Sequence, residues 1–145
     1  MGRRSNSYFQ FKQFRIEQER CAMKVSTDAV VLGALARAPH QHGNILDIGT
    51  GTGVLALMMA QKYPQAEIDA VEIDKEAFEQ ARQNVSSNKL GINITVHQQS
   101  FQEFEPSNID QYDLIITNPP YYSGQLQSSK QNINLARHGR ELIVF

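Results

Sequence analysis

Apolar residues recur along this chain with two different spacings. Short apolar runs or alternating apolar and polar positions, typical of strands, occur at 44–48, 67–73, 92–97 and 112–117. Residues 54–63 and 75–88 have the length and apolar pattern of helices. Strands that alternate with helices of this length indicate a parallel sheet with right-handed crossovers. The sequence therefore predicts an α/β fold with an open, doubly wound, mostly parallel sheet.

Two further elements are predicted before the first of these strands. Residues 29–36 are almost entirely apolar, and Ser26, Thr27 and Asp28 before them are helix-capping residues, so a short helix is expected to begin there. Further towards the N-terminus, aromatic and polar residues alternate around Phe9-Gln10-Phe11-Lys12. This alternation predicts a half-buried strand or a hairpin.

Composition indicates one domain over residues 1–145. The chain is 41% hydrophobic, enough for a sizeable core. Its apolar stretches are far shorter than the roughly 20 residues of a membrane span, and no signal-peptide block follows Met1. We therefore expect a cytoplasmic protein without membrane contact. Cys21 is the single cysteine, and we interpret it as a packing residue.

Charge is unevenly distributed along the chain. The first 24 residues hold six basic and two acidic side chains and carry a net +4, whereas the remaining 25–145 carry −5. A basic N-terminal arm of this kind is more often a solvated tail, and the alternative is a contact surface for phosphates.

A glycine-rich loop follows the first predicted strand, in the sequence Asp47-Ile48-Gly49-Thr50-Gly51-Thr52-Gly53. Glycines permit a sharp turn and let a ligand approach the main chain. The nicotinamide fingerprint would place its third glycine at Val54, one position later. Asp47, at the strand tip, is poorly placed for a pyrophosphate and well placed for a cationic ligand. The pattern favours S-adenosylmethionine over NAD.

An acidic residue, Glu72, stands at the end of the next predicted strand. In dinucleotide-binding folds an acid at this position accepts hydrogen bonds from ribose hydroxyls. We therefore predict Glu72 as a ribose ligand. The alternative role, capping the following helix, suits Asp74 better.

The last predicted strand ends in Thr117-Asn118-Pro119-Pro120-Tyr121-Tyr122. Two prolines stop the strand and hold Asn118 in a stiff loop. The Asn118 side-chain oxygen and the Pro119 carbonyl can accept hydrogen bonds from an amine that gains positive charge during methylation. Tyr121 offers a face for stacking a base.

These stretches, in this order on successive strand ends, resemble the class I S-adenosylmethionine-dependent amino-methyltransferases. The resemblance implies a Rossmann-like fold and S-adenosylmethionine as cofactor. It implies a catalytic group of Asn118, Pro119, Pro120 and Tyr121, and a cofactor site that includes Asp47, Gly49, Thr50, Gly51, Gly53, Glu72, Ile73, Ser100 and Phe101. The family acts on adenine N6, cytosine N4 or glutamine nitrogen alike.

The N-terminal portion of the sequence narrows the choice among these substrates. Phe9 to Phe14, Cys21 to Asp28 and Leu32-Gly33-Ala34 closely resemble the start of the bacterial tRNA1(Val) adenine-N6 methyltransferase family, which modifies the adenosine beside the anticodon. The resemblance implies a tRNA substrate. It also implies that Lys24 to Asp28 border the methionine end of the cofactor, with Thr27 and Asp28 as contacts or, alternatively, as helix caps.

The chain departs from that family in two ways. Gln98-Gln99-Ser100-Phe101 stands where an acidic residue commonly meets the cofactor adenine, and Ser100 is the substitute acceptor. Family members also continue well beyond residue 145. We therefore expect a sheet that is incomplete at its C-terminal end, an exposed fourth strand, weak cofactor binding and little or no activity of the chain alone.

Three alternatives to tRNA methylation remain open from the sequence. They are glutamine methylation of release factors, adenine methylation of DNA, and a truncated module that binds S-adenosylmethionine or nucleic acid without catalysis. The 43 residues before the first strand leave little room for the helical domain that release-factor enzymes carry. The spacing of the histidines, His40, His42, His97 and His138, suggests no metal site, and none is expected.

Overall fold

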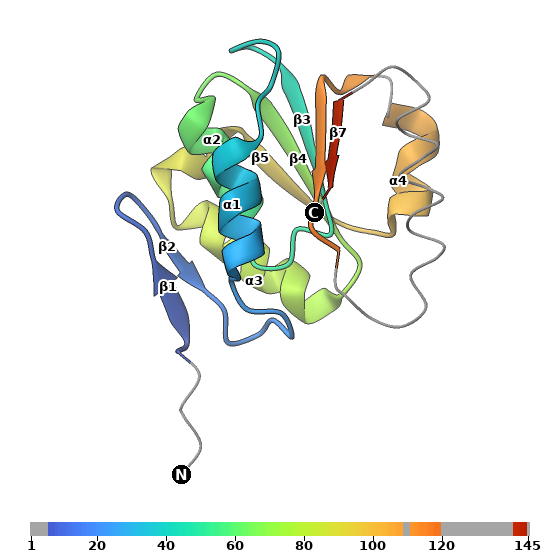
Figure 1. Ribbon diagram of the computed structural model, residues 1–145. Coiled ribbons are helices and arrows are strands. Elements are labelled where there is room, and N and C mark those ends of the chain that lie inside the picture. Colours follow the sequence, from blue (N-terminus) through green and yellow to red (C-terminus); the bar gives the residue numbers. More distant parts are fainter. Residues whose placement is uncertain (1–5, 109–110, 120–140, 145) are drawn as a thin grey trace.

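The computed structural model describes residues 6–108, 111–119 and 141–144. Its main sheet has five strands in the order β5-β4-β3-β6-β7, and every neighbouring pair in it is parallel (Figure 1). The strands are β3 (Asn44–Ile48), β4 (Glu67–Glu72), β5 (Ile94–Gln98), β6 (Leu114–Thr117) and β7 (Glu141–Val144). The predicted α/β fold with a parallel sheet is confirmed.

Four of these strands were predicted and β7 was not. Leu114 to Thr117 are all buried, as expected for a strand with protein on both faces. The expectation that this strand would form an exposed edge is wrong, because β7 pairs with it from Leu114↔Glu141 to Thr117↔Val144. The Ser and Gln residues of the segment 123–134 predict a loop or frayed helix, and this segment lies outside the described residues.

Helices cover both faces of the sheet. On one face lie α1 (Thr27–Leu35), α2 (Val54–Lys62) and α3 (Lys75–Ser86), and on the other lies α4 (Phe101–Asn108), as Figure 1 shows. A 3₁₀ helix, η1 (Lys89–Asn93), precedes β5. The three predicted helices are confirmed, and Ser26 caps α1 by accepting a hydrogen bond from the Ala29 N–H at 3.2 Å. The sequence analysis missed α4.

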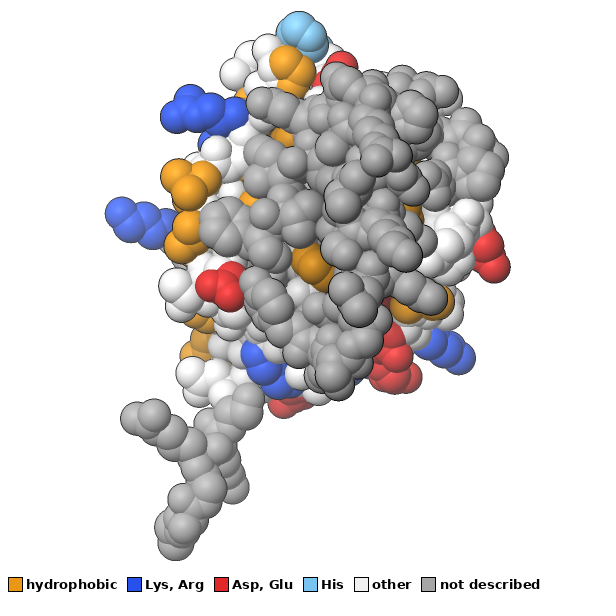
Figure 2. Space-filling model, turned by 45° about the vertical axis from the view of Figure 1, so that its right-hand side comes forward, with side chains coloured by type: hydrophobic (Ala, Val, Ile, Leu, Met, Phe, Trp, Pro, Cys, Tyr) orange, Lys and Arg blue, Asp and Glu red, His pale blue; other side chains and the backbone are white. Residues whose placement is uncertain are grey.

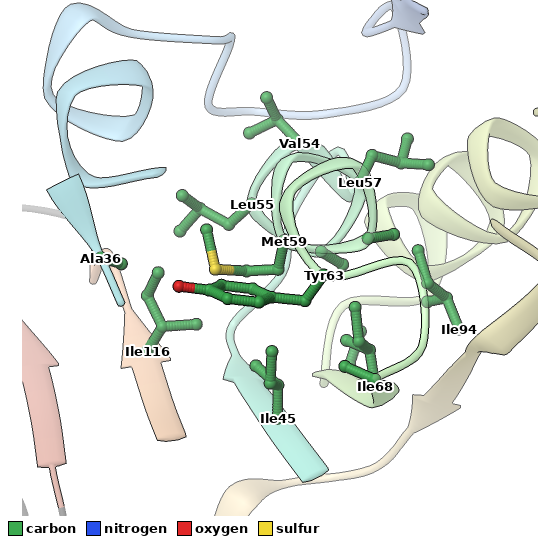
Figure 3. Close-up of a cluster of buried hydrophobic side chains, with 14 of the residues drawn as sticks. Ala36, Ile45, Val54, Leu55, Leu57, Met59, Tyr63, Ile68, Ile94 and Ile116 are labelled. Carbon is green, nitrogen blue, oxygen red and sulfur yellow. The ribbon is translucent and has the colours of Figure 1, made fainter. Parts of the chain in front are cut away.

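The larger core lies between the sheet and α2. Figure 3 shows Leu55, Met59 and Tyr63 of the α2 region facing Ile45 and Ile116 of the sheet. All five are buried. A second, smaller core on the opposite face contains Leu46, Val71 and Ile115 together with Phe104 and Tyr112. Because both faces are packed, the central strands read as continuous apolar runs.

A polar group adjoins the smaller core. The Asp69 carboxylate accepts a hydrogen bond from the Tyr112 hydroxyl and lies 2.7 Å from Nε2 of His97. Burial, and then the contact with Asp69, raise the pKa of Tyr112 above its ordinary value. The trio joins two strands to the segment that leads into β6.

The predicted hairpin is present at the N-terminus. Its strands β1 (Tyr8–Gln10) and β2 (Arg15–Glu17) pair antiparallel. All three β1 residues are exposed, whereas Ile16 of β2 is completely buried in the larger core. The interpretation of residues 1–24 as a solvated tail is therefore wrong for residues 6–24.

The basic side chains of this arm are partly neutralised. Arg15 lies 2.7 Å from Glu17 and over the ring of Tyr8, and Arg20 lies 2.7 Å from Glu76. These are exposed ion pairs, and screening by solvent makes their contribution to stability small. Figure 2 likewise shows Lys or Arg beside Asp or Glu along the lower margin of the described surface.

The described residues contain neither a candidate membrane-spanning helix nor a candidate metal site. No described helix has the length and apolar character needed to cross a membrane. Within residues 6–108, 111–119 and 141–144, no three His, Cys, Asp or Glu side chains are grouped so that they could hold a metal ion.

Candidate active site

The site forms where the strand order reverses. β4 and β5 lie on one side of β3, whereas β6 lies on the other, so the loops that follow β3 and β6 are neighbours. Ile48 pairs with Thr117, and the Thr117 hydroxyl donates to the Ile48 carbonyl at 2.9 Å. Open parallel sheets bind ligands outside the carboxyl ends of their strands at such a reversal. This pairing brings the glycine loop and Asn118 together.

The glycine loop has a conformation that its glycines make possible. Gly49, Gly51 and Gly53 have φ values of 69°, 55° and 86°. A Cβ at Gly49 or Gly51 would meet no atom within 4 Å, whereas one at Gly53 would contact Ala81 at 3.6 Å. The first two glycines therefore face open space, and the third faces α3.

Glu72, at the end of β4, borders the same space. Its carboxylate accepts from the Gly51 N–H at 2.8 Å and from the Asp74 N–H at 3.1 Å. Each carboxylate oxygen has two lone pairs, so both can accept a further hydrogen bond. These two contacts orient the carboxylate beside the loop. As predicted, Asp74 caps α3, accepting from the Ala77 N–H at 2.9 Å.

Asp47 lies beneath the loop and is completely buried. One carboxylate oxygen accepts from the Thr50 hydroxyl at 2.7 Å, and the other has no hydrogen-bond partner among the described residues. Burial raises the pKa of Asp47 to about 7, the Thr50 contact opposes this rise, and the negative charge of Glu72 adds to it. The hydrogen bond from Thr50 to Asp47 therefore connects the glycine loop to the end of β3.

The Asp47 pKa predicts how stability depends on pH. In the folded state the Asp47 carboxyl group stays protonated up to about pH 7, whereas in the unfolded chain it loses its proton near pH 4. The free energy of unfolding therefore falls as the pH rises between these values. Asp47→Asn removes this titration. We expect the unfolding free energy of the wild type, relative to Asp47→Asn, to decrease by on the order of 4 kcal/mol from pH 4 to pH 8.

Urea unfolding of both proteins at several pH values measures this difference. Gln61→Ala, which removes an exposed side chain that does not titrate from α2, is the control and should not alter the pH profile. Parallel pH profiles for the wild type and Asp47→Asn would contradict the expectation.

Asn118 follows β6 directly. Its side-chain oxygen is buried and has no hydrogen-bond partner among the described residues. A buried acceptor without a donor is costly, by about 1–3 kcal/mol, so a donor from outside the described residues would stabilise this oxygen. Pro119, which follows, cannot extend the strand.

The glycine loop, Glu72 and Asn118 share one cleft of about 320 Å³. The volume is within the range of small-molecule sites, from about 300 to 1,000 Å³. Its described walls are formed by Cys21, Ala22, Met23, Lys24, Val25, Ala29, Gly49, Thr50, Gly51, Thr52, Val54, Leu55, Glu72, Ile73, Asp74, Ala77 and Asn118. The glycine loop, the acid of β4 and the amide after β6 thus face the same space.

The cleft includes part of the predicted site. Among the predicted cofactor residues, Gly49, Thr50, Gly51, Glu72 and Ile73 line it, and so does the predicted catalytic Asn118. The walls do not include Thr27, Asp28, Asp47, Gly53, Ser100, Phe101 or Pro119. Pro120 and Tyr121 lie outside the described residues. The roles of these residues in binding and catalysis stay predictions.

The residues away from the walls have other local contacts. Thr27 and Asp28 are exposed in the first turn of α1, and Ser26 is the cap. The Ser100 hydroxyl accepts from the Glu103 N–H at 3.3 Å at the start of α4. Phe101 packs against the smaller core.

One wall was not predicted in full. Residues 21–25 line the cleft, although the sequence analysis placed only Lys24 and Val25 near the cofactor and treated Cys21 as packing. Cys21 is both buried and at the cleft, and burial raises the pKa of its thiol to about 11. No hydrophobic periodicity or glycine pattern marks this segment, so only the fold reveals it.

Comparisons with known proteins place this chain among families and folds. A family model of the methyltransferase small domain matches residues 25–143. A protein from Pseudoalteromonas translucida named tRNA1(Val) (adenine(37)-N6)-methyltransferase is 49% identical over 132 residues, which are 91% of this chain and 55% of that protein. A protein of the same name from Dyadobacter fermentans is 49% identical over 94% of this chain and 56% of its own length. The chain thus spans little more than half of these relatives.

Solved structures resemble the fold. An RNA methyltransferase from Salinibacter ruber in complex with S-adenosyl-L-homocysteine superposes with a TM-score of 0.60 at 18% identity, covering 84% of this chain and 72% of that one. A Streptococcus agalactiae protein of the NADB-Rossmann superfamily gives 0.60 at 19% identity, over 84% of this chain and 52% of that one. Both confirm the Rossmann-like architecture. The family model, which matches residues 25–143, shows that the chain belongs to the methyltransferase small domain family.

Proposed function

We propose that this chain binds S-adenosylmethionine in the cleft and directs its methyl group to N6 of an adenosine in tRNA, the adenosine beside the anticodon. One observation carries the proposal: Asn118, whose side-chain oxygen has no hydrogen-bond partner among the described residues, lines the same cleft as the glycine loop and Glu72. The names of the relatives from P. translucida and D. fermentans support the choice of tRNA. A tRNA substrate also supports a cytoplasmic location.

The walls of the cleft fit this cofactor. Gly49 and Gly51 leave the space that a side chain would otherwise fill. Glu72 has lone pairs for ribose hydroxyls, and Val54, Leu55 and Ile73 offer apolar contacts. S-Adenosylmethionine, when bound, supplies an electrophilic methyl group.

Asn118 supplies the acceptor that an amine needs. The lone pair of an exocyclic adenine amine is delocalised into the ring, and its nitrogen becomes positive as it takes up a methyl group. The Asn118 oxygen accepts an N–H of this amine and stabilises the charge without moving, because β6 is held by β3. Pro119 adds rigidity, and its carbonyl is a second acceptor. The proposed stacking of the adenine on Tyr121 rests on the sequence.

Lys24 is proposed to bind the carboxylate of the methionine portion. It is the only Lys or Arg among the described residues that line the cleft. Its ammonium donates to the carbonyls of Gln18 and Cys21, the latter at 3.1 Å, and keeps one further N–H. We expect Lys24→Met to weaken S-adenosylhomocysteine binding about 10- to 100-fold.

A ligand without the carboxylate isolates this contact. 5′-Methylthioadenosine lacks the amino-acid portion, so its affinity should change much less in Lys24→Met. Calorimetric titration of both ligands measures the difference, and Lys89→Met, at an exposed lysine of η1, is the control. If the two ligands lose affinity equally, Lys24 supports only the structure of residues 21–25 and does not bind the carboxylate.

Methyl transfer from labelled S-adenosylmethionine tests the function. The purified chain is incubated in excess over unmodified tRNA, release factor or DNA, and nucleosides are analysed by mass spectrometry. We expect slow formation of N6-methyladenosine in tRNA. Label in glutamine or DNA would favour the corresponding rival enzyme, and cofactor binding without transfer to any pool would favour a non-catalytic module.

A further inference from the structure

Three buried side-chain amides connect the N-terminal hairpin and the segment after it to the rest of the site. They belong to Gln18, Gln80 and Asn84, which are 5%, 2% and 1% exposed. Buried amides are retained only where hydrogen bonds satisfy them. Their partners therefore show what the fold requires them to hold.

Asn84, on α3, joins two segments that are distant in sequence. Its amide nitrogen donates to the Glu17 carbonyl at 2.8 Å and to the Thr52 carbonyl at 2.7 Å. Its oxygen accepts from the Glu17 N–H at 2.9 Å. One side chain thus binds both backbone groups of a β2 residue and one carbonyl of the glycine loop.

The other two amides hold the wall that follows β2. Gln80 accepts from the Arg20 N–H at 3.2 Å, and Gln18 accepts from the Val25 N–H at 3.0 Å. Residues 21–25 between these contacts line the cleft and contain no helix or strand. Side-chain hydrogen bonds therefore fix this wall, and Asn84 links the preceding strand β2 to Thr52 of the glycine loop.

We propose that Asn84 is a positioning residue that couples the hairpin to the cofactor loop. A cofactor that presses on the loop and on residues 21–25 stabilises β2 through Asn84, and loss of the Asn84 contacts weakens cofactor binding. The two effects are reciprocal, because both measure one coupling free energy. This inference rests on the proposed binding of S-adenosylmethionine in the cleft.

Hydrogen exchange with S-adenosylhomocysteine as the ligand tests the coupling in the wild-type chain. We expect backbone exchange in a peptide covering residues 15–20 to slow at least several-fold at saturating ligand. In Asn84→Asp, which keeps the acceptor for Glu17 and loses both donated bonds, we expect about tenfold weaker binding by calorimetry. The ligand should then no longer slow exchange in that peptide.

Val85→Ala is the matched control. Val85 is the next residue of α3, is 7% exposed and packs in the larger core, so its truncation lowers stability without touching the Asn84 hydrogen bonds. Val85→Ala should bind the ligand within twofold of the wild type and keep the exchange response. If Asn84→Asp and Val85→Ala lose affinity equally, Asn84 contributes only to stability and does not position the cofactor site.

The wild-type measurement decides the inference even if Asn84→Asp fails to fold. Ligand binding with unchanged exchange at residues 15–20 overturns the coupling and leaves the proposed function intact. Failure of the wild type to bind the ligand removes the proposed function, and the coupling with it.

Discussion

Replacement of Asn118 by alanine is expected to slow methyl transfer to tRNA by about 10²- to 10³-fold, as found when one preorganised polar contact to a developing charge is removed. The variant loses the acceptor that faces the amine. Glycine-loop and Glu72 contacts are unchanged, so S-adenosylhomocysteine affinity should remain within a few-fold of the wild type. Single-turnover rates, with enzyme in excess, resolve the effect even where the wild-type rate is low.

Gln61→Ala provides the matched control for this variant. It removes an exposed carboxamide from α2, outside the cleft walls, and should leave both rate and affinity unchanged. A near-wild-type rate for Asn118→Ala would remove Asn118 from the chemistry. A parallel loss of cofactor affinity would mean that it shapes the cleft instead.

Gly51→Ala is expected to weaken S-adenosylhomocysteine binding by about 10- to 100-fold, because its methyl group would enter the space that the ligand requires. The φ value of 55° also strains a non-glycine residue, by roughly 1–2 kcal/mol of stability. Calorimetric titration and urea unfolding of the same variant separate these two effects.

Gly53→Ala introduces the same type of backbone strain, but its added methyl group points in a different direction. Its φ is 86°, but its added methyl group would contact Ala81 on α3 and would not enter the cleft. We expect a similar loss of stability with a clearly smaller loss of affinity. If both alanine variants lose affinity equally, backbone conformation alone accounts for the role of these glycines.

Local patterns predicted much of the fold because each of them reports on neighbouring residues. The apolar runs at 44–48 and 112–117 mark strands buried on both faces, and Ser26 marks the start of α1. β7 was missed although Leu142, Ile143 and Val144 form an apolar run, because a run this short does not distinguish a strand from other buried segments. The start of α4 was missed because Ser100 was interpreted as a ligand residue, whereas its hydroxyl caps the helix.

The candidate site was predicted in part for the same reason. Glycines with positive φ and an acid at a strand end are local signals, so Gly49, Gly51 and Glu72 were found. Thr27 and Asp28 were chosen by resemblance alone, and the turn of α1 exposes them to solvent.

The sequence by itself determined the order of most strands and helices and the position of the glycine loop, and it predicted the roles of Glu72 and Asn118. Only the tertiary structure decided that these groups share one cleft, that residues 21–25 form its remaining wall, and that the hairpin packs on α3. The physical reason is the distance along the chain over which each kind of interaction acts. Periodicity and turn chemistry act within a few residues, whereas the pairing of β3 with β6 and the bonds from Asn84 to Glu17 join segments that are distant in the chain.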